Sequence, residues 1–221
     1  MKKHILLINT KAYMEGTGAR ALKLARICRR LSGKAGAEII LSVQPSDIPV
    51  TSKHITTFAQ HIDTAKPGAH TGHILPEAVK AAGAKGTLIS HSERRLDLGE
   101  IRDRIKRARE ARLTTVCCAP YTLMVGKIAA MKPDYVAIEP PELIGTGVSV
   151  SQARPYVISR SVELARKAGP GVSVLCGAGI STSEDVAVSL ELGAVGVLVA
   201  SSIVKSPRPE RVIRDLLRGF G

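Results

Sequence analysis

The sequence predicts an α/β fold: a single (β/α)₈ barrel domain over residues 1–221, compact and with some shortened helices. Its 221 residues can bury a sizeable core without disulfide or metal cross-links. Eight short apolar segments alternate with stretches of helical periodicity, and no change of composition marks a second domain. An open, doubly wound sheet is the alternative, but it rarely needs eight strands in so short a chain.

The eight predicted strands are mostly continuous in apolar character, and few of them alternate strictly with polar residues. This pattern is typical of parallel strands that are buried on both faces. In chain order, the predicted strands span residues 4–9, 38–43, 54–60, 87–90, 114–119, 135–139, 172–176 and 195–200.

Helices are predicted where polar and apolar residues mix at helical spacing between these strands. The connection at residues 45–53 leaves room for only about a turn of helix. The clearest predicted helices span residues 18–31, 100–112, 151–167, 182–192 and 207–217.

Local signals mark where several helices are expected to begin and end. Three segments have the spacing of a capping box, in which a Ser or Thr side chain caps the helix and an acid or amide three residues later bonds back. These segments are residues 90–93, 149–152 and 181–184. Four glycines are expected to end helices in the left-handed conformation. They are Gly33, Gly83, Gly169 and Gly193.

The net charge of +13 suits either nucleic acid or a small anionic substrate. With two Phe, four Tyr and no Trp, few rings are available for stacking on single-stranded bases. Acidic residues also interleave with the basic run of residues 94–112, as on a solvated helix face. The interpretation as a nucleic-acid-binding protein therefore depends on net charge alone, and we expect no nucleic-acid partner.

Composition also indicates the cellular setting. No apolar run approaches the ~18 residues of a membrane helix, and the apolar residues 5–8 are too short for a signal sequence. We therefore expect a cytoplasmic protein without a membrane partner. A single Asn and three Gln among many charged residues point to a heat-loving source. Four cysteines without CxxC spacing are expected to be buried thiols.

In a (β/α)₈ barrel the functional side chains follow the carboxyl ends of the strands. Lys11 follows the first strand, where it supplies a fixed cation, although a solvated loop lysine would look the same. His91 stands at the predicted start of a helix, whose dipole would keep the imidazole neutral and able to donate to a carbonyl. Glu139 ends a buried strand, where poor solvation should raise its basicity.

Small and stiff residues follow the last three strands. Two prolines and two glycines within residues 140–147 are the composition expected of a hinged lid. The turn at residues 177–179 and the small residues 200–202 would let backbone amides approach a phosphate. The same turn is a weak dinucleotide signal, because it lacks the third glycine. His70 and His73 have no third ligand nearby in the sequence, so no metal site is expected.

Four motifs occur in order along the chain: Asn9-Thr10-Lys11, Ser-His-Ser-Glu-Arg-Arg at residues 90–95, Glu139-Pro140, and Ile-Gly-Thr-Gly at residues 144–147. Together they resemble the triosephosphate isomerase family over nearly the whole chain. The short chain and the turn at residues 176–179 resemble its archaeal branch in particular. This resemblance implies interconversion of dihydroxyacetone phosphate and D-glyceraldehyde 3-phosphate through an enediolate, in the setting of glycolysis and gluconeogenesis.

The resemblance also implies residue roles. Glu139 would be the base and neutral His91 the electrophile, two roles that belong to the known chemistry of the family. Lys11 would complement the phosphate and the developing oxyanion, with Asn9 positioning it and Glu93 contacting it. The phosphate would be held by backbone amides, those of Ile144, Gly145, Gly179, Ala200 and Ser201.

Thr71 matches the family residue that reaches the Asn9 region of a neighbouring subunit, which implies a homo-oligomer, either a dimer or a tetramer. No metal or organic cofactor is implied. A different phosphate-handling barrel, such as a pentose-phosphate epimerase or a tryptophan-pathway enzyme, is the remaining alternative. Such a barrel shares the phosphate loops but does not require Lys11, His91 and Glu139 together.

Overall fold

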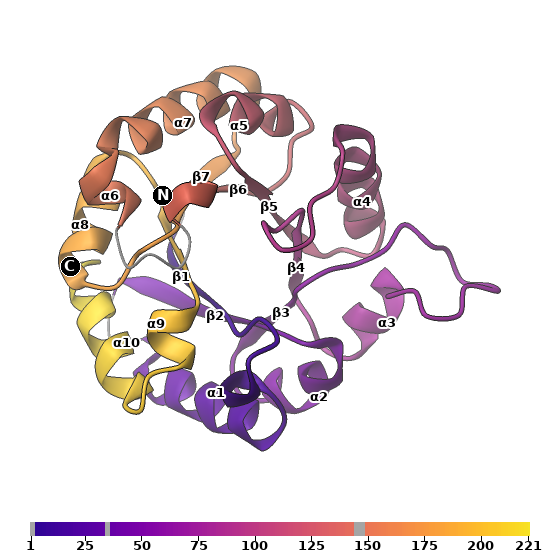
Figure 1. The fold of residues 1–221 in the computed structure, drawn as a ribbon. Coiled ribbons are helices and arrows are strands. Elements are labelled where there is room, and N and C mark those ends of the chain that lie inside the picture. Colours follow the sequence, from indigo (N-terminus) through magenta and orange to yellow (C-terminus); the bar gives the residue numbers. More distant parts are fainter. Residues whose placement is uncertain (1–2, 34–35, 144–148) are drawn as a thin grey trace.

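The computed structural model describes residues 3–33, 36–143 and 149–221, and in it eight parallel strands close into a barrel in chain order (Figure 1). The (β/α)₈ fold is thereby confirmed. Each predicted strand is present, with ends that differ from the prediction by two residues at most. The strands are β1 (His4–Asn9), β2 (Ala37–Val43), β3 (Thr56–Ala59), β4 (Gly86–Ile89), β5 (Thr114–Ala119), β6 (Tyr135–Ile138), β7 (Ser173–Gly177) and β8 (Gly196–Val199).

The strands lack polar alternation because both of their faces are covered. In β1, Leu6 and Ile8 belong to the apolar cluster between the barrel and its helices. Ile5 and Leu7 belong to a second, smaller cluster with residues from the other strands, which fills the barrel interior. Backbone pairing of β1 with both β2 and β8 closes the barrel and brings the first and last strands together.

The helices surround the barrel and bury their apolar faces against it (Figure 1). None of the helices in the described ranges has the length and apolar composition of a membrane span. In chain order they are α1 (Ala19–Leu31), α2 (Ile48–Thr51), α3 (Pro76–Ala81), α4 (Leu98–Glu110), α5 (Thr122–Ala129), α6 (Val150–Ala153), α7 (Pro155–Ala168), α8 (Ser183–Glu191), α9 (Ser201–Val204) and α10 (Pro209–Arg218).

Two of the predicted helix starts are wrong. Residues 91–97 form turns and no helix; α4 begins at Leu98, where Asp97 and Glu100 make the capping box. The box predicted at residues 181–184 lies one residue later, with Thr182 as the cap and Asp185 bonding back. Ser149 does cap α6, but the predicted helix 151–167 is divided into α6 and α7, because Pro155 interrupts the hydrogen bonding of a continuous helix.

Gly169 also departs from its predicted conformation. Gly33, Gly83 and Gly193 have positive φ as expected, but Gly169 has φ −141°. A Cβ atom at Gly169 would lie 2.2 Å from the carbonyl oxygen of Ala129. Glycine is therefore needed here for the close approach of the end of α7 to α5.

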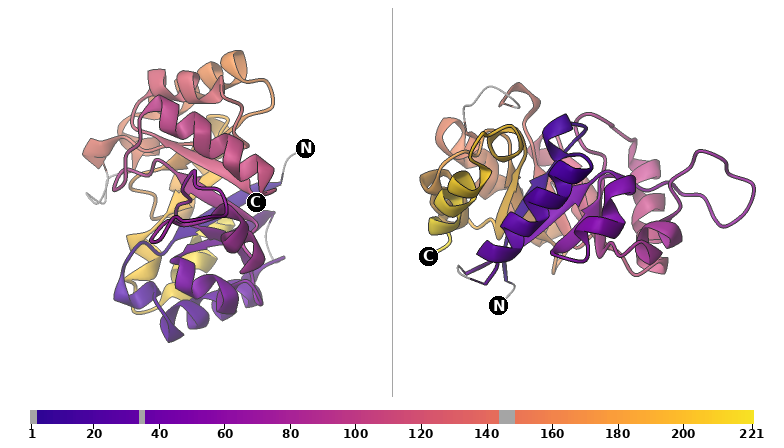
Figure 2. Two further views of the ribbon diagram at one scale, coloured as in Figure 1. Left: turned by 90° about the vertical axis from the view of Figure 1, so that its right-hand side faces the viewer. Right: turned by 90° about the horizontal axis from the view of Figure 1, so that it is seen from below.

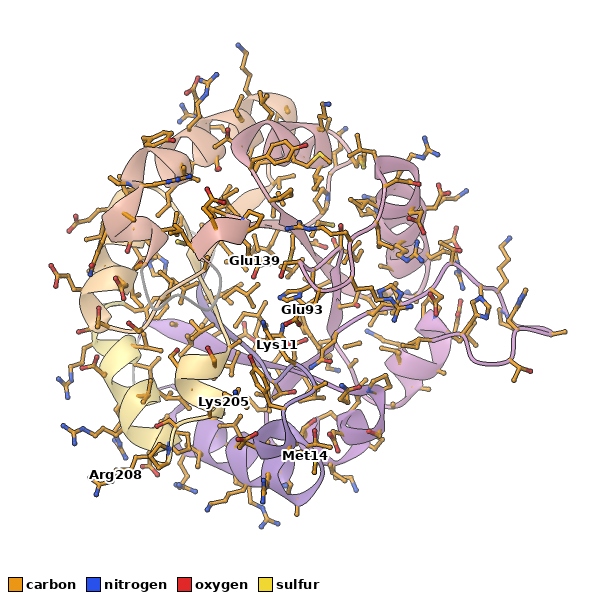
Figure 3. The ribbon with its side chains drawn as sticks, viewed as in Figure 1. Lys11, Met14, Glu93, Glu139, Lys205 and Arg208 are labelled. Carbon is orange, nitrogen blue, oxygen red and sulfur yellow. The ribbon has the colours of Figure 1, made fainter. Side chains whose placement is uncertain are left out.

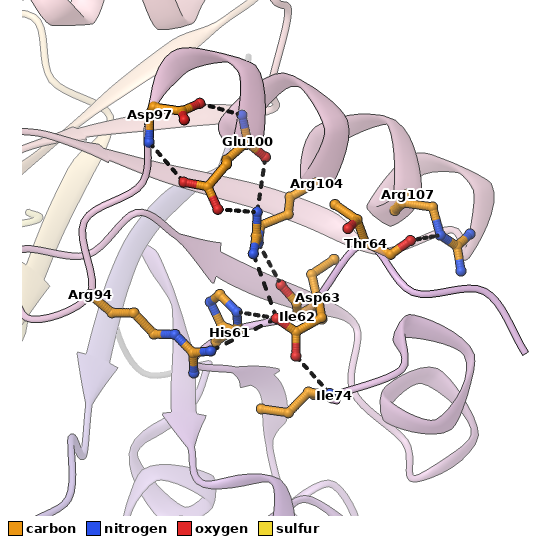
Figure 4. Close-up of polar contacts among 10 residues, drawn as sticks. All are labelled: His61, Ile62, Asp63, Thr64, Ile74, Arg94, Asp97, Glu100, Arg104 and Arg107. Atoms are coloured by element: carbon orange, nitrogen blue, oxygen red, sulfur yellow. Dashed lines mark hydrogen bonds and ion pairs between the residues drawn. The ribbon is translucent and has the colours of Figure 1, made fainter. Parts of the chain in front are cut away.

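A loop of residues 64–73, here called the protruding loop, extends away from the barrel between β3 and α3 (Figure 2). Its base is closed by Asp63, whose N–H donates to the Ile74 carbonyl and whose carboxylate accepts from the Ile74 N–H at 2.8 Å. Buried His61 and Arg104 both contact the Asp63 carboxylate (Figure 4). This cluster of charges fixes the loop base to α4.

Candidate active site

A cavity of about 340 Å³ opens at the carboxyl ends of the strands. Figure 3 shows Lys11, Glu93 and Glu139 over the opening of the barrel. The lining comes from the segments that follow β1, β4, β6, β7 and β8. The residues are Asn9, Lys11, Tyr13, His91, Glu139, Ala178, Gly179, Ile180, Ser181, Leu198, Val199, Ala200, Ser201 and Ser202.

Hydrogen bonds hold both the backbone and the ammonium group of Lys11. Its backbone is in the left-handed region at φ 49°, and its N–H donates to the Asn9 side-chain oxygen at 2.9 Å. Its Nζ donates to Glu93 Oε1, also at 2.9 Å. Non-glycine residues in this conformation are strained and persist where the surroundings enforce them. Asn9 and Glu93 thus place the ammonium group at a defined point on the cavity wall.

His91 presents one ring nitrogen to the cavity and uses the other for support. Its Nδ1 accepts from the backbone N–H of Glu93 at 3.3 Å, which requires an unprotonated Nδ1 and places the proton of a neutral ring on Nε2. Nε2 lies 3.6 Å from Glu139 Oε1. The helix predicted to begin at this point does not exist, because α4 begins only at Leu98, so the helix dipole expected to act on the ring is absent here.

Glu139 stands at the end of β6 with only 5% of its surface exposed. Its Oε2 has no hydrogen-bond partner among the described residues. The Cys118 thiol lies close by: burial, followed by the charge of the Glu139 carboxylate, raises its pKa well above the usual value and keeps it neutral. A buried carboxylate on the wall of a cavity is suited to accept a proton from a bound substrate.

The opposite wall of the cavity is formed by backbone. Ala178 and Gly179 are consecutive left-handed residues, with φ 76° and 74°, and they turn the chain sharply after β7. Gly179, Ala200 and Ser201 all line the cavity, and α9 begins at Ser201. Ser202 Oγ donates to the Ile180 carbonyl at 3.2 Å and ties the two segments together. Small residues here leave backbone amides accessible to an anion.

Asp185 fixes the turn that follows β7. Its Oδ2 accepts the backbone N–H groups of Ser181 and Thr182, each at 3.0 Å. Burial alone would raise the pKa of Asp185, but these backbone donors, with the Thr182 and Ser149 hydroxyls, hold it below the usual value. The ionised carboxylate therefore holds the turn that forms this wall of the cavity.

The predicted site residues divide into four groups. Around the one cavity lie Asn9, Lys11, His91, Glu139, Gly179, Ala200 and Ser201. Glu93 contacts Lys11, whereas Thr71 lies exposed on the protruding loop, and Ile144 and Gly145 of the predicted lid lie outside the described residues. Sequence reasoning missed Tyr13; its signal is an aromatic residue two positions after Lys11. Within the described ranges no group of His, Cys, Asp and Glu is arranged to hold a metal ion, His70 and His73 included.

Known proteins match this chain in sequence over nearly its whole length. The family model of triosephosphate isomerase matches residues 4–216. A triosephosphate isomerase from Methanoculleus marisnigri is 49% identical over 98% of this chain and 99% of its own. Those of Methanosarcina acetivorans, at 47% over 99% of both chains, and Methanocaldococcus jannaschii, at 45% over 97% and 99%, are similarly close. Because these matches cover nearly the whole chain at 45–49% identity, the chain belongs to the triosephosphate isomerase family.

Proposed function

We propose that the cavity interconverts dihydroxyacetone phosphate and D-glyceraldehyde 3-phosphate through an enediolate, with Glu139 as the base and His91 as the electrophile. The observation that carries this assignment is the buried Glu139 carboxylate, whose Oε1 lies 3.6 Å from His91 Nε2 in a cavity that Lys11 also lines. A base, a neutral donor and a cation around one small space are the groups that proton transfer next to a carbonyl requires.

The reaction moves one proton between neighbouring carbons. Glu139 removes the proton from the carbon next to the carbonyl, while His91 Nε2–H donates to the carbonyl oxygen and stabilises the negative charge that develops there. In the resulting enediolate, His91 gives a proton to the former carbonyl oxygen and takes the proton of the neighbouring hydroxyl, and Glu139 returns its proton to the former carbonyl carbon. Each donor placed where this charge develops is typically worth about 2.7–4 kcal/mol.

Lys11, Asn9 and the backbone wall have binding and positioning roles in this proposal. Lys11 complements the phosphate and the oxyanion, and the Asn9 oxygen fixes its backbone. The amides of Gly179, Ala200 and Ser201 hold the phosphate dianion, together with those of Ile144 and Gly145 in the lid segment. Only side-chain and backbone groups are used, so the proposal needs no metal or organic cofactor. The alternatives lack this support: a nucleic-acid protein explains none of these groups, and another phosphate-handling barrel does not require all three side chains.

Replacement of the base tests the proposal. Glyceraldehyde 3-phosphate is supplied to the purified protein, and the product is followed by coupled oxidation of NADH. The wild type is expected to turn over rapidly, and Glu139→Ala to lose about a thousandfold in kcat, because a general base contributes about 10²–10⁴-fold. Glu191→Ala, which removes an exposed acid at the end of α8, is the matched control. Near-normal turnover by Glu139→Ala would refute the assignment of the base.

We further propose a homo-oligomer, a dimer or tetramer, in which Thr71 completes the site of a neighbour. The protruding loop is exposed from residue 66 to residue 73. A second cavity of about 200 Å³, lined by Asn9, Glu93 and Arg94 among others, adjoins the catalytic one and could receive it. Light scattering is expected to give a multiple of 23.4 kDa. Thr71→Arg is expected to lower both that mass and kcat, and a fully active monomer would contradict the proposal.

We also propose that residues 1–221 form one domain that acts in the cytoplasm, in glycolysis and gluconeogenesis. Support for a reducing compartment comes from the four cysteines, which are all buried free thiols. A heat-loving source predicts that activity in the same coupled assay rises up to high temperature, and an optimum near 37 °C would argue against it.

A further inference from the structure

Tyr13 lines the catalytic cavity and has no role in the proton transfer described above. Its ring has a cation on each of two neighbouring elements: Lys205 Nζ lies 4.8 Å from the ring centroid, and Lys11 Nζ lies 6.0 Å from it. Figure 3 shows Lys205 on the side of α9 that faces the opening, next to Lys11. Tyr13 therefore stands between the lysine of the site and the helix that begins the phosphate-binding wall.

The loop that carries Tyr13 is well anchored. The Tyr13 carbonyl accepts the Gly16 N–H at 2.9 Å and the Thr17 hydroxyl at 3.0 Å. Gly16 packs so closely that a Cβ atom there would lie 2.7 Å from Thr10 Cβ and 3.1 Å from Val204 Cγ1. The first loop thus contacts α9 directly at Val204, one residue before Lys205. The Tyr13–Lys205 contact is a second link between the same two elements.

The ammonium group of Lys205 lies over the ring of Tyr13. Lys205 follows directly after α9 and forms no ion pair with any described residue. A cation over the face of an aromatic ring is attracted by the ring electrons. With no carboxylate competing for Lys205 in the described part of the chain, the ring of Tyr13 is the partner that defines its position, and Lys205 in turn restrains the ring.

We propose that Tyr13 is a specificity-determining wall of the substrate cavity and that Lys205 is its positioning residue. The pair fixes the distance between the loop that presents Lys11 and the α9 segment that presents Ala200 and Ser201. That distance sets the length of phosphorylated carbonyl compound that can reach both at once, which favours a three-carbon substrate. The inference rests on the proposed isomerase function and adds to it a determinant of substrate length.

Kinetics of Tyr13→Ala, Lys205→Met and the double variant test this inference. We expect Lys205→Met to raise KM for glyceraldehyde 3-phosphate about two- to fivefold with little change in kcat, the size of an exposed cation–ring contact. Tyr13→Ala should raise KM further, and the double variant should match Tyr13→Ala alone. Lys205→Arg should stay closer to the wild type than Lys205→Met. Lys106→Met, an exposed lysine on α4 with the same charge change, is the control expected to leave KM unchanged.

Two results would overturn the inference. A KM for Lys205→Met equal to that of the wild type shows that the contact positions nothing. Lys205→Met could instead raise KM by the same factor in the wild type and in the Tyr13→Ala background, with the increase lost at high salt. That result shows that the charge of Lys205 acts on the substrate directly. Binding of inorganic phosphate, measured by calorimetry on the wild type and every variant, reports the anion site independently of turnover. An inactive wild type that binds phosphate would instead reject the proposed function, so the two failures are distinguishable.

Discussion

The position of the Glu139 carboxylate depends on the absence of a side chain at Gly177. A Cβ atom at Gly177 would lie 2.6 Å from Glu139 Cγ, closer than real Cβ contacts allow. Gly177 ends β7, the strand that pairs with β6, so the two residues meet across neighbouring strands. Glycine at this point thus leaves the space that the proposed base occupies.

Gly177→Ala is therefore expected to move the carboxylate and to lower kcat by about 10- to 100-fold, since a misplacement of about 1 Å can cost that much. The coupled assay measures the change, and thermal unfolding checks that the barrel remains folded. Gly126→Ala in α5 is the control, because its Cβ would make only an ordinary 3.7 Å contact with Leu164. Unchanged kcat in Gly177→Ala would show that the base tolerates displacement.

At the scale of the element, α4 shows how a capping signal can be misplaced. Both Ser90 and Asp97 precede an acid at the required spacing, but only Asp97 caps a helix. Ser90 is instead in the left-handed region at φ 59°, and its hydroxyl accepts the Leu96 N–H. This turn brings His91 to the cavity and Glu93 to the Lys11 side chain, two contacts that a helix beginning at Ser90 would not provide.

Asp97→Ala removes the side chain that accepts the Glu100 N–H at 2.8 Å. The free energy of unfolding is expected to fall by about 1 kcal/mol, the usual cost of losing such a cap. Urea unfolding measures it. Asp103→Ala, at an exposed position within the same helix, should change the free energy by less than about 0.5 kcal/mol. Equal effects of the two substitutions would show that the box contributes no more than a surface charge does.

At the scale of the whole molecule, buried ionisable groups tie distant segments together. His61 is kept neutral by burial, which lowers its pKa below 6.5. Burial would raise the pKa of Asp63, but the Ile74 N–H and His61 outweigh it and lower the pKa below 3.8. Asp185 is shifted in the same direction. For all three groups the folded pKa lies below the unfolded one, so each contributes stability above its unfolded pKa and loses it as pH falls.

The free energy of unfolding is therefore expected to decline as pH falls below about 6.5, first through His61 and then, near and below pH 4, through the two aspartates. Asp185→Asn should be less stable than the wild type at pH 7 and should lose less on further acidification. Urea unfolding between pH 3 and pH 7 measures both. Asp103→Asn is the exposed control, and parallel curves for Asp185→Asn and the wild type would contradict the linkage.

The sequence alone determined the barrel and most of its cavity. Eight continuous apolar segments report burial on two faces, a property that each strand carries locally, so β1 and β5 were predicted to the residue. Because functional side chains follow strand ends in this fold, Lys11, His91 and Glu139 could also be located. The resemblance of the motifs then supplied their roles.

The tertiary structure decided what depends on neighbours that are distant in the chain. Sequence patterns could not distinguish the helix cap at Asp97 from the turn at Ser90, because each residue precedes an acid by three positions. The turn at Ser90 is recognisable only from its contacts in the folded barrel. The close approach at Gly169, the space that Gly177 leaves for Glu139, and the contact of Tyr13 with Lys205 all join separate elements. Local propensity acts over a few residues, whereas these contacts arise only when the barrel closes.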